Sequence, residues 1–303
     1  MKLSQLKKVI KNSPILYLLS FPVIFIRRSI LRQKVAIQME VIDTLNELLH
    51  EDPVLYLSEF DGKFALDARS DLFWRIVLEG LYERELPEIA AKSVDRERDV
   101  IDIGANVGFY SVKLSRVMGK GRMFAIEPTV NASQRLRRNV ELNDLSGKVE
   151  IIQKIISDKG GALKINTIEG KEEYSSIGMM THPQTMGKEL HVETVKSVTL
   201  DTLVEERSIN PGFIKIDVEG AEHLVFRGAE NVLHKHRPII LSELSDQLLN
   251  ANGSSWIEVI RFIESFDYVV VNPLKPATKP KSQAFSDILC YPREQYDKVQ
   301  SLM

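Results

Sequence analysis

The 303-residue sequence has few of the features that indicate a disulfide-rich or nucleic-acid-binding protein. It has one cysteine, Cys290, which excludes an internal disulfide and fits a reducing cytosol. Its 40 cationic and 42 acidic residues give a net charge of -2, so no nucleic-acid partner is expected. What is present is 44% hydrophobic and 27% charged residues, a composition typical of a folded chain with a substantial core.

The first 39 positions contain no acidic residue, and eight lysines and arginines flank the apolar run Pro14–Ile26. This run is too short for a membrane-spanning helix, which needs about 20 apolar residues. Arg27 and Arg28 follow it where a secretory signal peptide would have a small-residue cleavage site, so export is not expected. Two interpretations of residues 1–34 remain: peripheral attachment to the inner face of a membrane, which the one-sided charge favours, or a helical arm packed on protein.

Turn signals and hydrophobic periodicity divide the chain into parts. A helix is predicted over 40–50, a hairpin around Asp61-Gly62, and further helices over 71–78 and 83–92. The predicted divisions are an N-terminal arm (1–39), a helix-and-hairpin part (40–98), a core domain (99–293) with an insertion (158–200), and a C-terminal tail (294–303).

Within the core domain, short apolar strands alternate with helical segments. This pattern favours a doubly wound α/β fold, a mostly parallel seven-stranded sheet with helices on both faces. The insertion interrupts the alternation with short strands at 162–165 and 195–200 around the polar segment 167–189. The predicted core strands are 100–103, 122–126, 149–156, 213–216, 238–241, 268–271 and 286–291, and the predicted helices are 108–118, 132–142, 221–233 and 255–265.

The first core strand runs into a turn that contains Gly104 and Gly108. Glycine permits a positive φ and the close approach of a ligand, and the following helix N-terminus offers free N–H groups. A dinucleotide fingerprint would also have glycine where Asn106 and Phe109 stand. Asp102 would repel a phosphate but attract a sulfonium or ammonium group. The turn therefore favours a cationic ligand over a pyrophosphate.

Acidic residues follow two further core strands. Glu127 ends the second strand, where a carboxylate in a doubly wound sheet binds ribose hydroxyls. Lys215, Asp217, Glu219 and Glu222 surround the end of the strand 213–216, and ligands bind in the crevice at such strand ends. Glu219 and Glu222 also fit the first turn of a helix, where the helix dipole favours acids, but that reading does not explain Asp217.

Together these segments resemble the FkbM family of methyltransferases over about residues 60–292. The resemblance implies a class I methyltransferase (Rossmann-like) fold, S-adenosylmethionine as cofactor, and O-methylation of a hydroxyl on a sugar, glycolipid, polysaccharide or related secondary metabolite. The motifs that carry it are Asp102-Ile103-Gly104-Ala105-Asn106-Val107-Gly108, Glu127-Pro128 and Lys215-Ile216-Asp217-Val218-Glu219-Gly220-Ala221-Glu222, with shorter matches at Gly80-Leu81-Tyr82-Glu83, Asn139–Asn143, Ser157-Asp158, Thr199-Leu200-Asp201, Gly228-Ala229, Arg237-Pro238 and Glu243.

The resemblance also implies residue roles. Glu127 would hold the ribose, and Ile156 with Ser157 the edge of the adenine. The remaining implied cofactor residues surround the methionine part or its turn, and they are Glu83, Asp102, Gly104, Ala105, Asn106, Gly108 and Phe109.

A hydroxyl acceptor must lose its proton, so a general base is expected at the strand-end crevice. The candidates are Asp217, Glu219, Glu222 and Glu243, of which we favour Asp217 or Glu219. A divalent cation held by these carboxylates would be an alternative way to acidify the hydroxyl, although no residue spacing identifies a metal.

Two other functions remain open on the sequence alone, since fold does not dictate chemistry. One is an NAD- or nucleotide-sugar-dependent enzyme, which Asn106 and Phe109 disfavour. The other is a membrane-attached, non-catalytic scaffold, which the intact acids at 102, 127, 217 and 219 disfavour.

Overall fold

The computed structural model describes residues 52–80, 82–168, 170–171, 174–177, 189–276, 278, 280 and 286–300. All of them belong to the unit Asp52–Met303. The predicted arm, the predicted helix over 40–50 and most of the polar segment 167–189 lie outside the described residues. Among the helices that are described, none has the length and apolar character needed to span a membrane.

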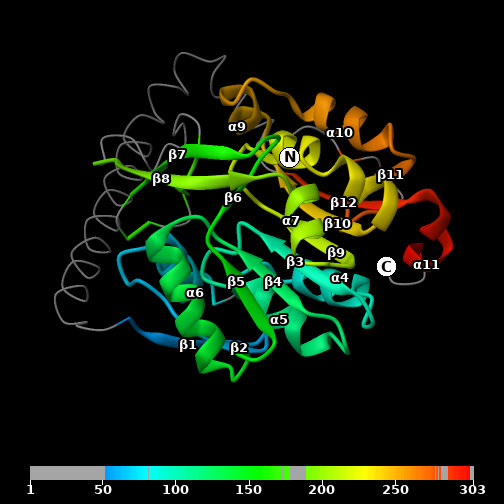
Figure 1. The fold of residues 1–303 in the computed structure, drawn as a ribbon. Helices are drawn as coiled ribbons and strands as arrows, with labels where there is room; N and C mark the ends of the chain where they lie inside the picture. The colour runs from blue at the N-terminus through cyan, green and yellow to red at the C-terminus, as the bar shows by residue number, and fades with distance from the viewer. Residues whose placement is uncertain are drawn as a thin grey trace, which may run out of the picture. The chain divides into compact units, whose positions relative to one another are not determined.

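The central sheet has seven strands in the order β11-β12-β10-β9-β3-β4-β5 (Figure 1). Neighbouring strands from β10 to β5 are parallel, whereas β12 is antiparallel to both β10 and β11. This confirms the predicted doubly wound, mostly parallel sheet. The strands are β3 (Asp99–Ile103), β4 (Met123–Ile126), β5 (Val149–Ile152), β9 (Pro211–Ile216), β10 (Ile239–Leu244), β11 (Tyr268–Val271) and β12 (Ser286–Pro292).

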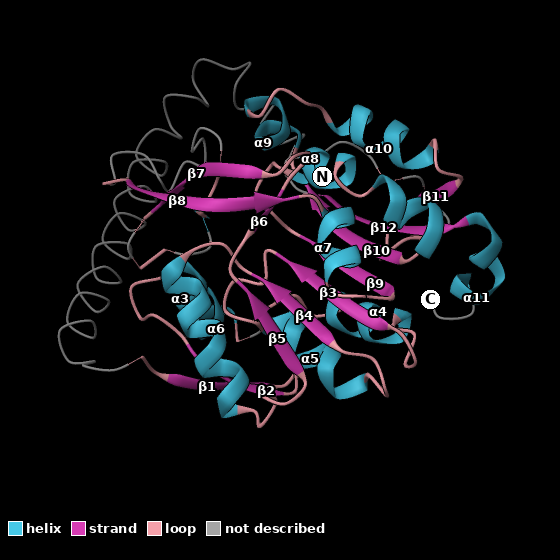
Figure 2. Cartoon of the chain, viewed as in Figure 1, coloured by secondary structure: helices cyan, strands magenta, loops and turns pink. Residues whose placement is uncertain are grey.

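Both faces of this sheet are apolar and covered by helices (Figure 2). Because successive side chains of a strand point to opposite faces, Val100 and Leu241 pack on one face and Ile101 and Ile240 on the other. The first face carries α3 (Asp71–Glu79), α4 (Leu86–Ser93), α5 (Phe109–Val117) and α6 (Val130–Leu142). The second carries α7 (Leu200–Glu206), α8 (Glu222–Arg227), the π-helix η3 (Val232–His236), α9 (Asp246–Ala251) and α10 (Trp256–Glu264).

The predicted hairpin forms from β1 (Val54–Leu57) and β2 (Gly62–Ala65), which pair antiparallel. Two asparagines of α6 attach it to the core. The side chain of Asn139, which is 0% exposed, accepts from the Ala65 N–H at 2.7 Å and donates to the Ala65 carbonyl at 3.2 Å. Asn143 makes the same two contacts with the backbone of Lys63, at 3.0 and 2.7 Å. The amides thus satisfy β2 backbone groups that a neighbouring strand would otherwise pair.

The insertion forms a second, three-stranded sheet, and it takes two residues from a predicted core strand. The strand predicted over 149–156 is wrong in its length, because only β5 joins the central sheet. Ile155 and Ile156 form β6, which pairs with β8 (His191–Val198), and β8 pairs with β7 (Gly161–Thr167). An unbroken apolar run does not reveal that its two ends pair in different sheets.

Two predicted helices also differ in extent. The helix predicted over 221–233 is divided into α8 and η3. The side chain of Asp201 in α7 accepts from the Val232 N–H at 2.9 Å and so caps the first residue of η3. At Gly228 a Cβ would lie 2.1 Å from the carbonyl oxygen of Ser157, so the chain comes too close there for any side chain. The helix predicted over 83–92 begins only at Leu86.

Candidate active site

The glycine turn joins β3 to α5 and requires glycine for reasons of space and backbone angle. Gly104 and Gly108 have φ of 76° and 94°. A Cβ on Gly104 would lie 1.8 Å from the backbone oxygen of Asp217, and one on Gly108 would lie 2.5 Å from the Leu136 side chain. The turn therefore packs directly on the end of β9, and α5 begins without a side-chain cap.

Two buried carboxylates fix this turn. Asp102 is 1% exposed, and its Oδ2 accepts from the Ser111 hydroxyl at 2.6 Å. Glu127 accepts from the Asn106 N–H at 2.9 Å and from the Thr129 hydroxyl at 2.7 Å. Burial raises the pKa of both carboxyl groups. Among the described residues, Asp102 Oδ1 and Asn106 Oδ1 are buried without a hydrogen-bond partner.

A cleft runs along both sides of the glycine turn, at the carboxyl ends of β3, β4 and β9. Gly104, Asn106 and Asp217 line both of its halves. One half has a mainly apolar wall and is also lined by Ile103, Ile126, Glu127, Pro128, Ile155, Ile156, Ile165, Ser175, Ile177, Val218, Glu219 and Ala221. The other half is also lined by Leu72, Tyr82, Glu83, Ala105, Val107, Phe109, Tyr110 and Lys215.

Most of the predicted cofactor residues line this cleft, and three do not. Asp102 and Ser157, which are 1% and 2% exposed, are buried and line neither half of the cleft. Gly108 lies against Leu136. These three therefore support the turn or its surroundings, whereas the lining residues are those that a ligand would contact.

The predicted catalytic residues occupy different positions. Asp217 and Glu219 line the cleft. Glu222 does not line either half: it is 1% exposed, and its Oε1 accepts from the N–H groups of Val218 and Gly220 at 3.2 and 3.1 Å. Burial raises the pKa of Glu222 to about 7. Its visible contacts hold the loop that carries Glu219.

Glu243 lies one strand away from Asp217. Leu241 and Ser242 of β10 are in register with Lys215 and Ile216 of β9, so Glu243, still within β10, lies at the level of Asp217, which directly follows β9. Across the next strand, Glu243 is directly opposite Asp287 of β12. The sequence did not identify Asp287 as a site residue. One signal could have: an antiparallel strand begins at the edge where the parallel strands end, and Asp287 is the second residue of the antiparallel strand β12.

Lys215 is the cation at the centre of these carboxylates. Its Nζ lies 3.0 Å from Asp217 Oδ2 and 5.0 Å from the centre of the Tyr110 ring. Burial opposes its charge, but Asp217, Asp102 and Glu83 together raise the pKa of Lys215 above its ordinary value. Glu83 accepts from the Tyr110 hydroxyl, and burial raises the pKa of Glu83.

Within the described part of the chain, no group of three or more His, Cys, Asp or Glu side chains is arranged to hold a metal ion. Asp217, Asp102 and Glu83 instead interact with the single cation Lys215.

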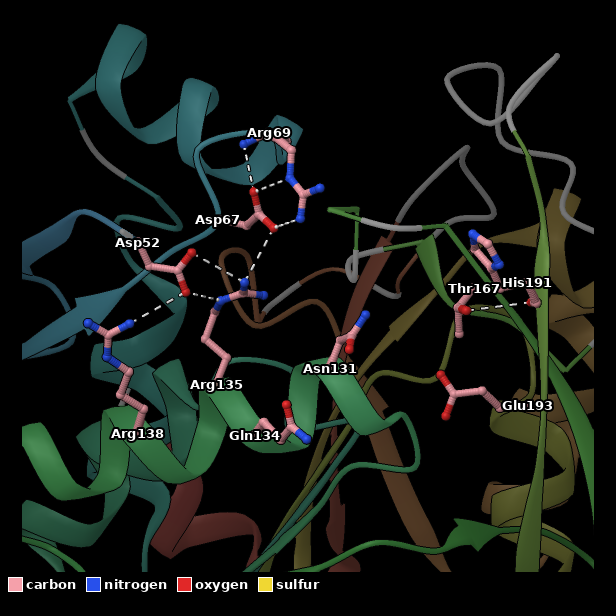
Figure 3. Close-up of a pocket in the computed structure, with 10 residues that line it drawn as sticks. All are labelled: Asp52, Asp67, Arg69, Asn131, Gln134, Arg135, Arg138, Thr167, His191 and Glu193. Carbon is pink, nitrogen blue, oxygen red and sulfur yellow. Dashed lines mark hydrogen bonds and ion pairs between the residues drawn. The ribbon is translucent and has the colours of Figure 1, made fainter. Parts of the chain in front are cut away.

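A second, open cavity of about 560 Å³ lies between α6 and the β7–β8 sheet (Figure 3). Arg135 crosses one side of it, with Nε 2.9 Å from Asp52 Oδ2 and Nη2 3.3 Å from Asp67 Oδ2. Arg69 binds the same Asp67 at 2.8 Å. Across the gap, Glu193 accepts from the Val130 N–H at 3.1 Å. The charged side chains of this cavity bind one another and the backbone, so we propose no reaction or ligand for the cavity.

Comparison with known proteins relates the glycine turn and the carboxylates at the strand ends to one protein family. The model described as the methyltransferase FkbM domain matches residues 102–270. Hexuronic acid methyltransferase AglP of Haloferax volcanii is 25% identical over 191 residues, which are 61% of this chain and 71% of that protein. Methyltransferase sdnD of Sordaria araneosa is 26% identical over 155 residues, 43% of this chain and 60% of that protein.

Solved structures show weaker similarity. The methyltransferase FkbM of Methylobacillus flagellatus KT has a TM-score of 0.41 at 17% identity, covering 65% of this chain and 44% of that one. The M. jannaschii TYW2 structure in complex with AdoMet has a TM-score of 0.39 at 13% identity, covering 80% and 85%.

Proposed function

Because the chain belongs to the FkbM family of methyltransferases, whose domain matches more than half of its 303 residues, we propose that it is an S-adenosylmethionine-dependent O-methyltransferase. The acceptor we propose is a hydroxyl on a sugar or on a related glycolipid, polysaccharide or secondary metabolite. The AglP relative is a hexuronic acid methyltransferase, and this supports a sugar as the acceptor. The observation that carries the proposal is the two-sided cleft around the glycine turn.

The residues of this cleft fit the cofactor. In the half with the mainly apolar wall, the isoleucine side chains would contact the adenine and Glu127 would bind the ribose. The half lined by Glu83, Asp217 and Lys215 would hold the methionine part. Asn106 Oδ1, buried and without a hydrogen-bond partner among the described residues, is available to a ligand donor. When bound, S-adenosylmethionine supplies an activated methyl group, so the chain itself must align the acceptor and take its proton.

Calorimetry tests this proposal directly. S-adenosylhomocysteine should bind and NAD should not. Glu127→Gln should weaken binding about tenfold or more, since a hydrogen bond to a charged group contributes about 1.5–3 kcal/mol. Glu230→Gln, which changes an exposed acid outside the cleft, is the matched control. A preference for NAD would favour the nucleotide-dependent alternative, and no binding of either ligand would favour a non-catalytic scaffold.

We also propose a cytoplasmic location with peripheral attachment to the inner face of a membrane through residues 1–34. The support is the charge of that segment, eight cations and no acid around an apolar run.

A further inference from the structure

Glu243 and Asp287 face each other beside the cleft. They are directly opposite across the antiparallel strands β10 and β12, and the Cβ atoms of such residues lie about 5 Å apart. Both side chains are partly buried. In the part of the chain that the structure describes, neither carboxylate has a hydrogen bond or an ion pair with another residue, and Asp287 has only the contact with its own backbone N–H. They are therefore two acids close together without the partners that normally stabilise buried charge.

The surroundings make full ionisation of both groups unfavourable. Lys215 is the cation within reach, and it already binds Asp217. Burial, then the charges of Asp217 and Asp287, raises the pKa of Glu243 well above its ordinary value. Burial, then Glu83 and Asp217, raises the pKa of Asp287 to about 7. The titratable groups around the two acids are Tyr82, Glu83, Tyr110, Lys215, Asp217 and Glu219.

We propose that the Glu243–Asp287 pair is the site that accepts the proton of the methyl acceptor, and that a positive charge in the neighbouring cleft prepares it by displacing the proton it holds. This inference rests on the proposed function. Asp217 and Glu219, the two predicted bases that line the cleft, are less suited, because Asp217 is paired with Lys215 at 3.0 Å and Glu219 lines the half with the mainly apolar wall.

The charges balance over one reaction. The acceptor oxygen bonds to the methyl carbon as the carbon–sulfur bond breaks, the electron pair of that bond stays on sulfur, and the hydroxyl proton passes to the pair. The cleft therefore loses one positive charge as the pair gains one proton. Since an opposite charge nearby lowers a carboxyl pKa by about one unit or more, the two events favour each other.

The test compares S-adenosylmethionine, which carries a sulfonium charge, with S-adenosylhomocysteine, which does not. Each is titrated into the full-length protein at pH 7 in buffers of different ionisation enthalpy, which gives the protons released on binding. Binding of S-adenosylmethionine should release more protons, by about 0.4 proton for a one-unit decrease from a pKa near 7. Glu243→Gln and Asp287→Asn should each reduce this excess, whereas Glu230→Gln should leave it unchanged. The ligands' own amino groups can also release protons on binding. This contribution is the same for the unmodified protein and the variants, so it cancels when they are compared.

The unmodified protein gives a second readout if a variant does not fold. The affinity for S-adenosylmethionine relative to S-adenosylhomocysteine should rise severalfold from pH 6 to pH 8, as the pair loses its proton. Failure of both ligands to bind would overturn the proposed function. Tight binding of both, with equal proton release and a flat affinity ratio, would leave that function in place and refute the role of the pair.

Discussion

At the scale of single residues, the cleft stands out because its carboxylates outnumber the cations that neutralise them. Asp67 and Asp99, elsewhere in the described chain, bind arginines that help to hold their pKa values below the ordinary range despite burial. Asp102, Glu243 and Asp287 have no arginine, and burial raises their pKa values. Such raised values are typical of functional sites, because folding alone gains nothing from them.

The raised pKa of Asp287 has a consequence for stability. Its pKa rises from 3.8 in the unfolded chain to about 7 in the folded protein, so between these values the folded state binds more protons. The free energy of unfolding should therefore fall as pH increases from 5 to 8. Asp287→Asn removes the titrating group, so its stability should fall less and exceed that of the wild type at pH 8, by on the order of a few kcal/mol.

Urea unfolding at pH 5, 6, 7 and 8 measures this effect. Asp144→Asn is the control, because Asp144 is exposed and its left-handed backbone, with φ of 57°, suits asparagine. The interpretation of Asp287 would be wrong if both variants followed the wild-type curve.

At the scale of elements, α6 connects the hairpin to the glycine turn. Asn139 binds the backbone of Ala65 in β2, and its Nδ2 also donates to the carbonyl of Val107 at 2.8 Å. One buried amide thus satisfies a strand edge and a turn that lie in distant parts of the sequence. Removing it leaves buried backbone groups without partners, which costs about 1–3 kcal/mol for each group.

Asn139→Ala leaves three such groups without partners and should therefore lower the free energy of unfolding by about 3 kcal/mol or more. It should also weaken binding of S-adenosylhomocysteine, since Val107 belongs to the turn that contacts the cleft. Asn131→Ala, an exposed asparagine on the same helix, should change stability by less than about 0.5 kcal/mol. Chemical denaturation and calorimetry provide the two measurements, and equal losses in both variants would show that the amide of Asn139 has no special role.

At the scale of the whole molecule, local patterns predicted the central sheet, the hairpin and the glycine turn. These features arise from periodicity and from residues such as Gly104 that lie close together in the sequence. The predictions failed where distant segments decide the structure, as when Ile155 and Ile156 leave the central sheet to pair with β8. Asp287 was missed for the same reason, because its position opposite Glu243 depends on strand pairing and not on its neighbours in sequence.

The proposed attachment of residues 1–34 to a membrane leads to a prediction for the full chain. Eight cations near an anionic surface contribute about 1 kcal/mol each, and the apolar run Pro14–Ile26 adds to this by entering the interface. The full chain should sediment with vesicles that contain phosphatidylglycerol, more weakly with phosphatidylcholine alone, and more weakly still at high salt, which screens charge. A chain that begins at residue 35 should remain in the supernatant while it still binds S-adenosylhomocysteine. If both chains sediment equally, the arm packs on protein and the cations have another role.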